Sequence, residues 1–170
     1  HVTMVLSCMG GFVDGQLVGT APDAQYYLFV TEDVASENPV EESYWVEAAE
    51  EADRLGADVI SSSLGYYEFD NPNYGHYYDE FTGNSAFASK GANIAFSKGI
   101  VVVASAGNSA GSPEPYNHIG VPAEALMTLT RVSRMLDDIL NRVPQRAAPY
   151  VGASAFAHKA GLHASAIVKD

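Results

Sequence analysis

Apolar residues recur at helical spacing between residues 45 and 55 and predict a helix there. The stripe consists of Trp45, Ala48, Ala49, Ala52 and Leu55. Side chains three or four positions apart lie on one face of a helix, so this face is expected to pack against a core. The acidic side chains around it are expected to form a solvated surface: Glu42, Glu47, Glu50, Glu51 and Asp53.

Both ends of this helix carry sequence signals. Asn38 is expected to cap the start, and Pro39 suits the first helical position. Glu41 can reach back to complete a capping box. Gly56 can adopt the left-handed backbone that ends a helix. Together these four residues define where the helix begins and where it stops.

Shorter apolar runs predict strands on either side of a second helix. The runs are residues 57–62 and 100–105, and residues 85–98 between them have the pattern of a helix. Earlier in the chain, residues 2–9 suit a short helix and residues 24–31 another strand. Continuous apolar strands that alternate with helices are typical of a parallel sheet covered on both faces. The pattern therefore predicts an α/β fold with a doubly wound parallel sheet.

The charge of the chain excludes two classes of partner. It carries 21 acidic side chains against nine basic ones, a formal net charge of −12. Nucleic acid and an anionic membrane surface would both repel such a protein. No apolar run approaches the length of about 20 residues that a membrane-spanning helix needs. Cys8 is the single cysteine, which excludes an intramolecular disulfide and a cysteine-based zinc cluster. We expect no metal and no cofactor.

The balance of charge changes near residue 130. Residues 1–130 hold 18 acidic and three basic side chains, whereas residues 131–170 hold three acidic and six basic ones. Such an asymmetry indicates two parts of different origin. We expect a first unit over residues 1–126 and a second over residues 127–170. The second unit is expected to be a helical appendage, because an apolar stripe at helical spacing runs over residues 129–143.

Four segments of the first unit follow one another in a characteristic order. They are residues 1–3 (HVT), 18–22 (VGTAP), 63–65 (SLG) and 103–109 (VASAGNS), followed by residues 118–125 (HIGVPAEA). In this order, and with these intervening elements, they resemble the subtilisin-like serine proteases. The resemblance covers about residues 1–126. It implies an incomplete subtilisin-like sheet and the hydrolysis of peptide bonds in an extended peptide or protein substrate.

The resemblance also implies roles for individual residues. His1 would be the general base, and Asn108 would donate a hydrogen bond to the oxyanion. Ser63, Leu64 and Gly65 would pair with the substrate as an added strand. Without the resemblance, Asn108 would be a turn residue in a loop and His1 a chain end.

The nucleophile and its surroundings depart from the family pattern. The family's Ser follows Gly-Thr, whereas the candidate here, Ser154, follows Ala153. The Gly that normally follows the His is replaced by Val2, and the Asp that orients the His would precede His1. In related triads, loss of that Asp lowers turnover by about 10⁴-fold. We therefore expect the chain to be inactive as a protease.

The second unit resembles a different family. Residues 129–134 (LTRVSR), 149–163 (PYVGASAFAHKAGLH) and 168–170 (VKD) are similar to the citramalate and isopropylmalate synthases. Those enzymes condense acetyl-CoA with a 2-oxo acid, and the similar part is the linker that follows their catalytic barrel. By resemblance, His163 is the residue that would have served the synthase site. The barrel and its metal ligands have no counterpart here, so synthase activity is not expected.

Three hypotheses for the function are open. The leading one is a non-catalytic fusion, derived from a protease, that retains a peptide-binding edge. The second is an active, remodelled protease that uses His1 and Ser154. The third is a binding module that holds an extended peptide without cutting it. Open sheet edges also predict self-association. The protease part implies a secreted or extracytoplasmic location and the synthase part a cytoplasmic one, so the location is open.

Overall fold

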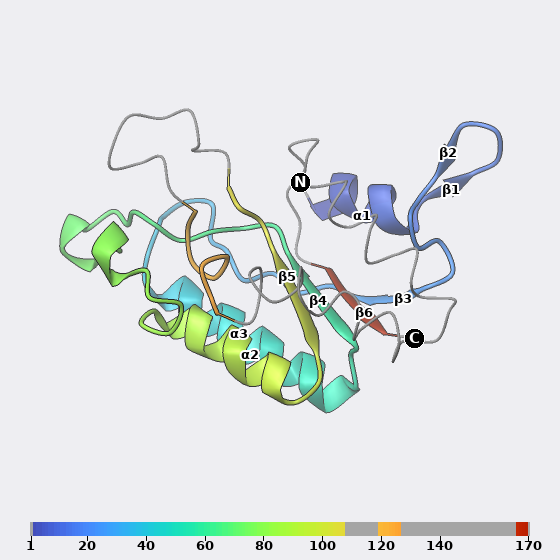
Figure 1. Ribbon diagram of the computed structural model, residues 1–170. Coiled ribbons are helices and arrows are strands. Elements are labelled where there is room, and N and C mark those ends of the chain that lie inside the picture. Colours follow the sequence, from blue (N-terminus) through green and yellow to red (C-terminus); the bar gives the residue numbers. More distant parts are fainter. Residues whose placement is uncertain (1, 108–118, 127–165, 170) are drawn as a thin grey trace.

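The computed structural model describes residues 2–107, 119–126 and 166–169, which form a mixed α/β fold (Figure 1). The helices are α1 (Val2–Gly10), α2 (Val40–Leu55) and α3 (Phe87–Ser97). The strands are β1 (Phe12–Val13), β2 (Leu17–Val18), β3 (Gln25–Tyr27), β4 (Val59–Ser62), β5 (Val101–Ala104) and β6 (Ala166–Lys169). The 3₁₀ helices η1 (Pro72–Tyr74) and η2 (Tyr78–Glu80) lie between β4 and α3. The predicted α/β class is confirmed.

The main sheet has the strand order β3, β6, β4, β5. β4 and β5 are parallel, with Ile60 opposite Val102, as a strand–helix–strand unit requires. β6 runs antiparallel to both β3 and β4. The predicted parallel pairing is therefore confirmed for β4 and β5. Residues 127–170 were expected to be a helical appendage, and this expectation is wrong for Ala166–Lys169, which form a strand. β6 lies far from β3 and β4 in sequence, so the local pattern of those strands does not determine its direction.

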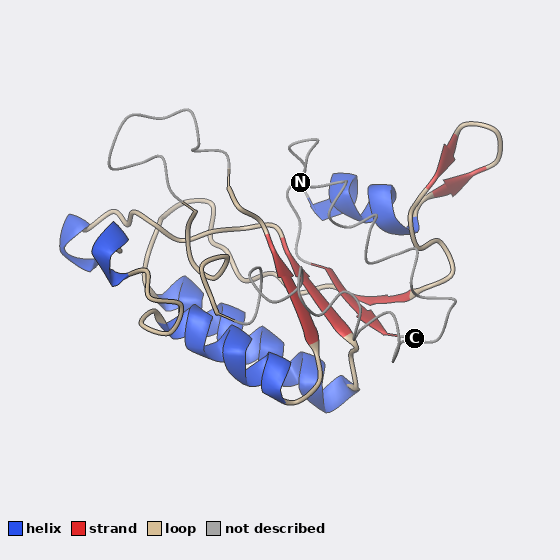
Figure 2. Cartoon of the chain, in the orientation of Figure 1, coloured by secondary structure: helices blue, strands red, loops and turns tan. Residues whose placement is uncertain are grey.

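Helices α2 and α3 pack against each other on one side of β4 and β5 (Figure 1 and Figure 2). Members of the predicted α2 stripe lie in this core together with residues of both strands: Trp45, Ala49, Ala52, Ile60 and Val102. The two helices approach closely, since a Cβ on Gly91 would lie 2.8 Å from Val46 Cγ2. Along β4 and β5, buried residues alternate with partly exposed ones. In the described part of the chain, one face of these two strands is therefore buried more deeply than the other.

The start of α2 differs from the expected cap. Pro39 occupies the N-cap position with φ −58° and ψ −19°, and it makes no side-chain capping bond. Asn38 lies one position earlier and is therefore not the cap. The other half of the predicted capping box is present, since Asn38 N–H donates to Glu41 Oε2 at 3.2 Å. At the other end, Gly56 has φ 73°, as predicted.

Residues 119–126 lie beside the chain that leaves β4. Tyr66 and Val121 exchange two backbone hydrogen bonds, of 2.8 and 2.9 Å, in an antiparallel bridge. A Cβ on Gly120 would lie 2.9 Å from Tyr66 O, so this approach requires glycine. The same segment contacts α3, because Ser89 Oγ donates to Glu124 Oε1.

The N-terminal elements form a second, smaller cluster. Val5 and Met9 of α1 pack against Tyr26, whose hydroxyl donates to Ala21 O at 2.7 Å. β1 and β2 form an antiparallel hairpin that projects from the rest of the chain (Figure 1). β3 is shorter than the strand predicted over residues 24–31. None of the described helices has the length and apolar character needed to cross a membrane.

The outer strands of the main sheet lead to a prediction about assembly. Within the described residues, β3 and β5 each pair on one side only. Because unpaired strand edges favour association, we expect earlier elution in size-exclusion chromatography as the concentration rises from about 1 μM to about 100 μM. Val101→Lys places a charge on β5 and is expected to reduce the shift. A single monomeric elution volume at all concentrations would contradict the prediction.

Candidate functional site

The carboxyl ends of β4 and β5 lie at the same edge of the main sheet because these strands are parallel. Ligands commonly bind at this edge of an α/β sheet. Ser63, Leu64 and Gly65 follow β4 directly, and Ser105 follows β5. Ser105 N–H donates to Ser62 O at 2.8 Å, so the two chains stay side by side just beyond the strands.

Segment 63–65 comprises Ser63, Leu64 and Gly65, which follow β4 directly. No backbone hydrogen bond joins it to another residue that the structure describes. Leu64 packs its side chain against the main core, whereas Gly65 is exposed. A Cβ on Gly65 would meet Val121 O at 3.7 Å, an ordinary contact. The segment is therefore anchored by the Leu64 side chain, while its N–H and C=O groups have no backbone partner among the described residues.

Hydrogen bonds fix the carboxyl ends of β4 and β5 beside this segment. Trp45 Nε1 on α2 donates to Ser62 Oγ at 2.8 Å, and both groups are buried. On the neighbouring strand, Gly107 N–H donates to the hydroxyl of Ser105 at 3.1 Å. Gly107 has φ 78°, a conformation that favours glycine, and it directly precedes Asn108 in the sequence. The hydrogen bond to Ser105 and the left-handed backbone of Gly107 therefore define the turn just before Asn108.

Four of the predicted site residues lie outside the described residues: His1, Asn108, Ser154 and His163. Their roles stay predictions. The structure brings together segment 63–65 and residues 105–107 at the carboxyl edge of the sheet. It also shows that α1 begins at Val2, next to His1.

A buried acid on α2 was missed by the sequence-based prediction. Glu42, expected on a solvated surface, is 4% exposed. Its Oε2 accepts a hydrogen bond from Ala88 N–H at 2.9 Å, and its Oε1 lies 2.5 Å from His76 Nε2. The expectation was wrong because Glu42 lies three residues before Trp45 and so shares the buried face of the helix. That spacing was the signal that could have revealed it.

A second polar cluster holds the chain just after segment 63–65. The Tyr66 hydroxyl donates to Glu32 Oε1 at 2.7 Å and lies 3.1 Å from the carbonyl oxygen of Glu41. Burial, followed by the negative charge of Glu32, raises the pKa of Tyr66. Burial also raises the pKa of Glu32, and the hydrogen bond from Tyr66 opposes that rise. Tyr66 therefore remains an uncharged donor at neutral pH.

The described part of the site is suited to the recognition of backbone groups. Segment 63–65 presents N–H and C=O groups that pair with no described backbone group, whereas Ser105 beside it is 5% exposed. Within the described ranges, no group of three or more His, Cys, Asp or Glu side chains could hold a metal ion.

Comparison with known families supports the first of the two resemblances. The family model described as the Subtilase family matches residues 1–134. The chain belongs to the subtilase family. The match includes segment 63–65 and residues 105–107, and it continues beyond residue 126, where the resemblance was expected to end.

The subtilase chain is also similar, over a shorter stretch, to citramalate and homocitrate synthases. Fifty residues are 52% identical to (R)-citramalate synthase of Streptomyces coelicolor, covering 29% of the chain and 9% of that protein. Fifty-five residues are 47% identical to homocitrate synthase of Pyrococcus abyssi, covering 32% of the chain and 15% of that protein. For (R)-citramalate synthase of Aquifex aeolicus the identity is 48% over 50 residues, covering 29% and 10%. The chain thus spans no more than 15% of these relatives. No solved structure matches it.

Proposed function

We propose that this subtilase chain binds extended peptides or proteins along segment 63–65 without cleaving them. The observation that carries the proposal is that the segment, at the carboxyl edge of a parallel strand pair, has no backbone hydrogen-bond partner in the described part of the chain. A peptide laid beside the segment can complete these hydrogen bonds as an added strand. Membership of the subtilase family supports a peptide as the ligand.

The finer assignment of the fold belongs to the same proposal. The described sheet is then part of an incomplete, doubly wound sheet of the subtilisin type. The parallel pairing of β4 and β5, with α3 between them in sequence, supports this assignment. In the catalytic arrangement that the family resemblance implies, His1 is the base and Asn108 the oxyanion donor.

The proposed absence of cleavage depends on Ser154. Ala153 stands where the family has Thr, and the charge balance changes before this part of the chain. Similarity to the synthases supports a separate origin for part of the chain. A serine outside the structural context of a nucleophile is not activated by a base, so sequence similarity around it carries little weight.

Two substitutions at Gly65 test the binding mode. Gly65→Pro removes the backbone N–H, whereas Gly65→Ala keeps it. Because a hydrogen bond contributes about 0.5–1.5 kcal/mol net, the proline variant is expected to bind about two- to tenfold more weakly than the alanine variant. Fluorescence anisotropy of a labelled extended peptide measures the affinities, and urea unfolding checks that both variants are folded.

The outcomes separate binding from cleavage. Equal affinities of the two folded variants would contradict backbone pairing at Gly65. Mass spectrometry of the same mixtures is expected to show intact peptide. Peptide fragments, or labelling of Ser154 by an active-site serine probe, would contradict the proposed absence of cleavage.

The similarity to the citramalate and homocitrate synthases supports a second proposal, which concerns the origin of part of the chain and not its activity. The chain spans only 9% to 15% of those proteins. We propose that residues 129–170 derive from a synthase. Within them, His163 is the residue that would have served the synthase site. We propose no condensation reaction for this chain by itself.

A further inference from the structure

His76 and Glu42 form an ion pair that joins two parts of the fold. Glu42 lies on α2, and His76 lies between η1 and η2 in the loop formed by residues 66–86. His76 Nε2 is 2.5 Å from Glu42 Oε1, and their side chains are 17% and 5% exposed. A pair this deeply buried is costly to break, because removing one partner leaves the other without compensation.

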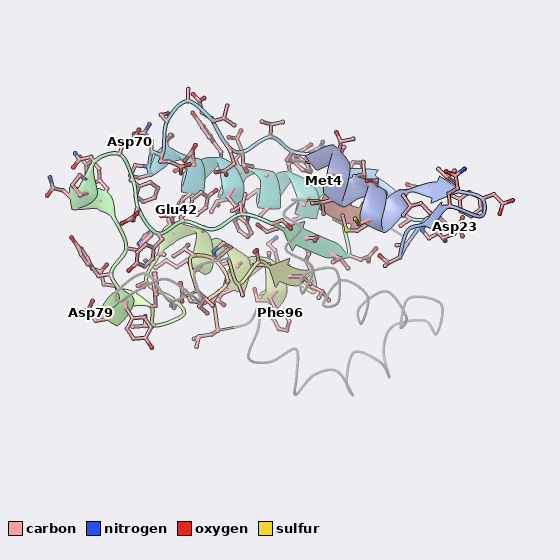
Figure 3. All side chains as sticks on the ribbon, turned by 90° about the horizontal axis from the view of Figure 1, so that it is seen from above. Met4, Asp23, Glu42, Asp70, Asp79 and Phe96 are labelled. Atoms are coloured by element: carbon pink, nitrogen blue, oxygen red, sulfur yellow. The ribbon has the colours of Figure 1, made fainter. Side chains whose placement is uncertain are left out.

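The same carboxylate also holds the start of α3. Glu42 Oε2 accepts from Ala88 N–H at 2.9 Å in a buried position. One side chain of α2 therefore binds both the loop and the helix that follows it (Figure 3, where Glu42 is labelled). Loss of the Glu42 carboxylate would therefore remove the contact to His76 in the loop and the contact to Ala88 in α3.

The loop around His76 is organised by contacts of its own. His76 N–H donates to Tyr67 O at 2.8 Å, which closes the loop on itself. The imidazole ring lies 5.8 Å from the Phe69 ring and 6.3 Å from the Phe81 ring, measured between centroids. Because the loop begins directly after Gly65, its attachment to α2 bears on the position of segment 63–65.

The charged groups that act on His76 come from three elements and are all acidic. Glu42 belongs to α2, Glu80 to η2 and Glu124 to the segment of residues 119–126. Glu124 accepts from Ser89 Oγ through Oε1, while its Oε2 is buried and has no partner among the described residues. The hydrogen bond to Glu42 raises the pKa of His76, burial opposes this, and the charges of all three acids raise it further.

We propose that the His76–Glu42 pair is a proton-operated latch that fixes the loop of residues 66–86 against α2 and the start of α3. The protonated imidazole holds the latch closed. Its effect on peptide binding rests on the proposed function of segment 63–65, whereas the latch itself does not. The neutral imidazole can still donate one hydrogen bond to Glu42, so deprotonation weakens the connection rather than removing every contact.

The direction of the pH dependence follows from linkage. A histidine whose pKa is higher in the folded than in the unfolded protein contributes stability that is fully present below its unfolded pKa, about 6.5. That contribution is lost as the pH rises through the folded pKa of His76. The latch therefore loosens as the pH rises.

Nuclear magnetic resonance of the imidazole groups, recorded on the full chain from about pH 5 to about pH 9, tests the latch directly. The His76 signal is assigned by its loss in His76→Gln. Its pKa is expected to lie above that of an unperturbed histidine and to fall in Glu42→Gln, which keeps an acceptor for Ala88 N–H. Glu68→Gln removes an exposed acid of the same loop and is expected to leave the titration unchanged.

Hydrogen exchange of the His76 and Ala88 amides gives the second readout. Their protection factors are expected to fall as the pH rises, by about tenfold for each unit by which the ion pair raises the pKa. In Glu42→Gln the protection is expected to lose this dependence. A wild-type His76 that titrates at or below the ordinary value, or whose deprotonation leaves both protection factors unchanged, would overturn the latch.

Peptide affinity distinguishes failure of the latch from failure of the proposed function. With the latch intact, affinity for the labelled peptide is expected to fall over the pH range in which His76 loses its proton. If His76 titrates as expected and the affinity does not change, the connection to segment 63–65 is wrong and the latch stands. If neither Gly65 variant alters binding, the proposed peptide site is wrong, and the His76 titration still decides the latch.

Discussion

Replacing Trp45 with alanine is expected to lower the free energy of unfolding by about 3–5 kcal/mol. Trp45 is 3% exposed and lies in the core shared by α2, α3 and the main sheet. Its Nε1 also donates to Ser62 Oγ at 2.8 Å. The substitution therefore creates a cavity and leaves a buried hydroxyl without its donor, and both effects destabilise the fold.

Unfolding in urea, followed by far-ultraviolet circular dichroism, measures this change, since the substitution removes the chain's single Trp and its fluorescence. Tyr44→Ala is the matched control, because Tyr44 precedes Trp45 on α2 and is 45% exposed. A change within about 0.5 kcal/mol is expected there. If Trp45→Ala costs no more than Tyr44→Ala, α2 does not pack on the sheet as described.

Glu41→Ala is expected to have the next largest effect, a loss of about 3 kcal/mol. The Glu41 side chain is 1% exposed. Oε1 accepts from Asp33 N–H at 2.9 Å and Oε2 from Asn38 N–H at 3.2 Å. A hydrogen bond to a charged group contributes about 1.5–3 kcal/mol, and the alanine variant loses two of them. The residues that precede α2 would lose the hydrogen bonds that Asp33 and Asn38 donate to Glu41.

Two further variants isolate the cause of that loss. Glu41→Gln keeps one acceptor oxygen, so about half of the loss is expected. Glu50→Ala removes an exposed acid from the same helix and is expected to change stability by less than about 0.5 kcal/mol. The free energies come from urea unfolding at constant pH. Equal effects of Glu41→Ala and Glu50→Ala would show that the carboxylate of Glu41 does not hold the two amide groups.

Local sequence patterns predicted several elements well. The stripe that contains Trp45 and Ala49 and the ending at Gly56 correspond to α2 as observed. The runs at residues 57–62 and 100–105 contain β4 and β5, which pair in parallel as expected. The reach of Glu41 back to the backbone of Asn38 was also correct. These features depend on residues within one or two turns of each other, so the pattern along the chain is sufficient to find them.

The candidate site was only partly accessible to such patterns. Segment 63–65 and its position after β4 were predicted, and the subtilase family of the chain is confirmed. The pair formed by Glu42 and His76 was not, because the two residues are 34 positions apart and meet only through packing. A glutamate next to an apolar stripe is usually solvated, so burial of Glu42 required its partners to be known.

By itself, the sequence determined which segments form the core helices, the end of α2 at Gly56, the parallel pairing of β4 and β5, and the family of the chain. Periodicity, capping and motif order are properties of neighbouring residues, and no distant contact is needed to recognise them. Only the tertiary structure decided the presence and antiparallel direction of β6, the burial of Glu42, and the lack of backbone partners for segment 63–65 among the residues described. Each of these depends on which groups, distant in sequence, come within bonding distance. The residues next to a carboxylate or a backbone amide do not identify its hydrogen-bond partner.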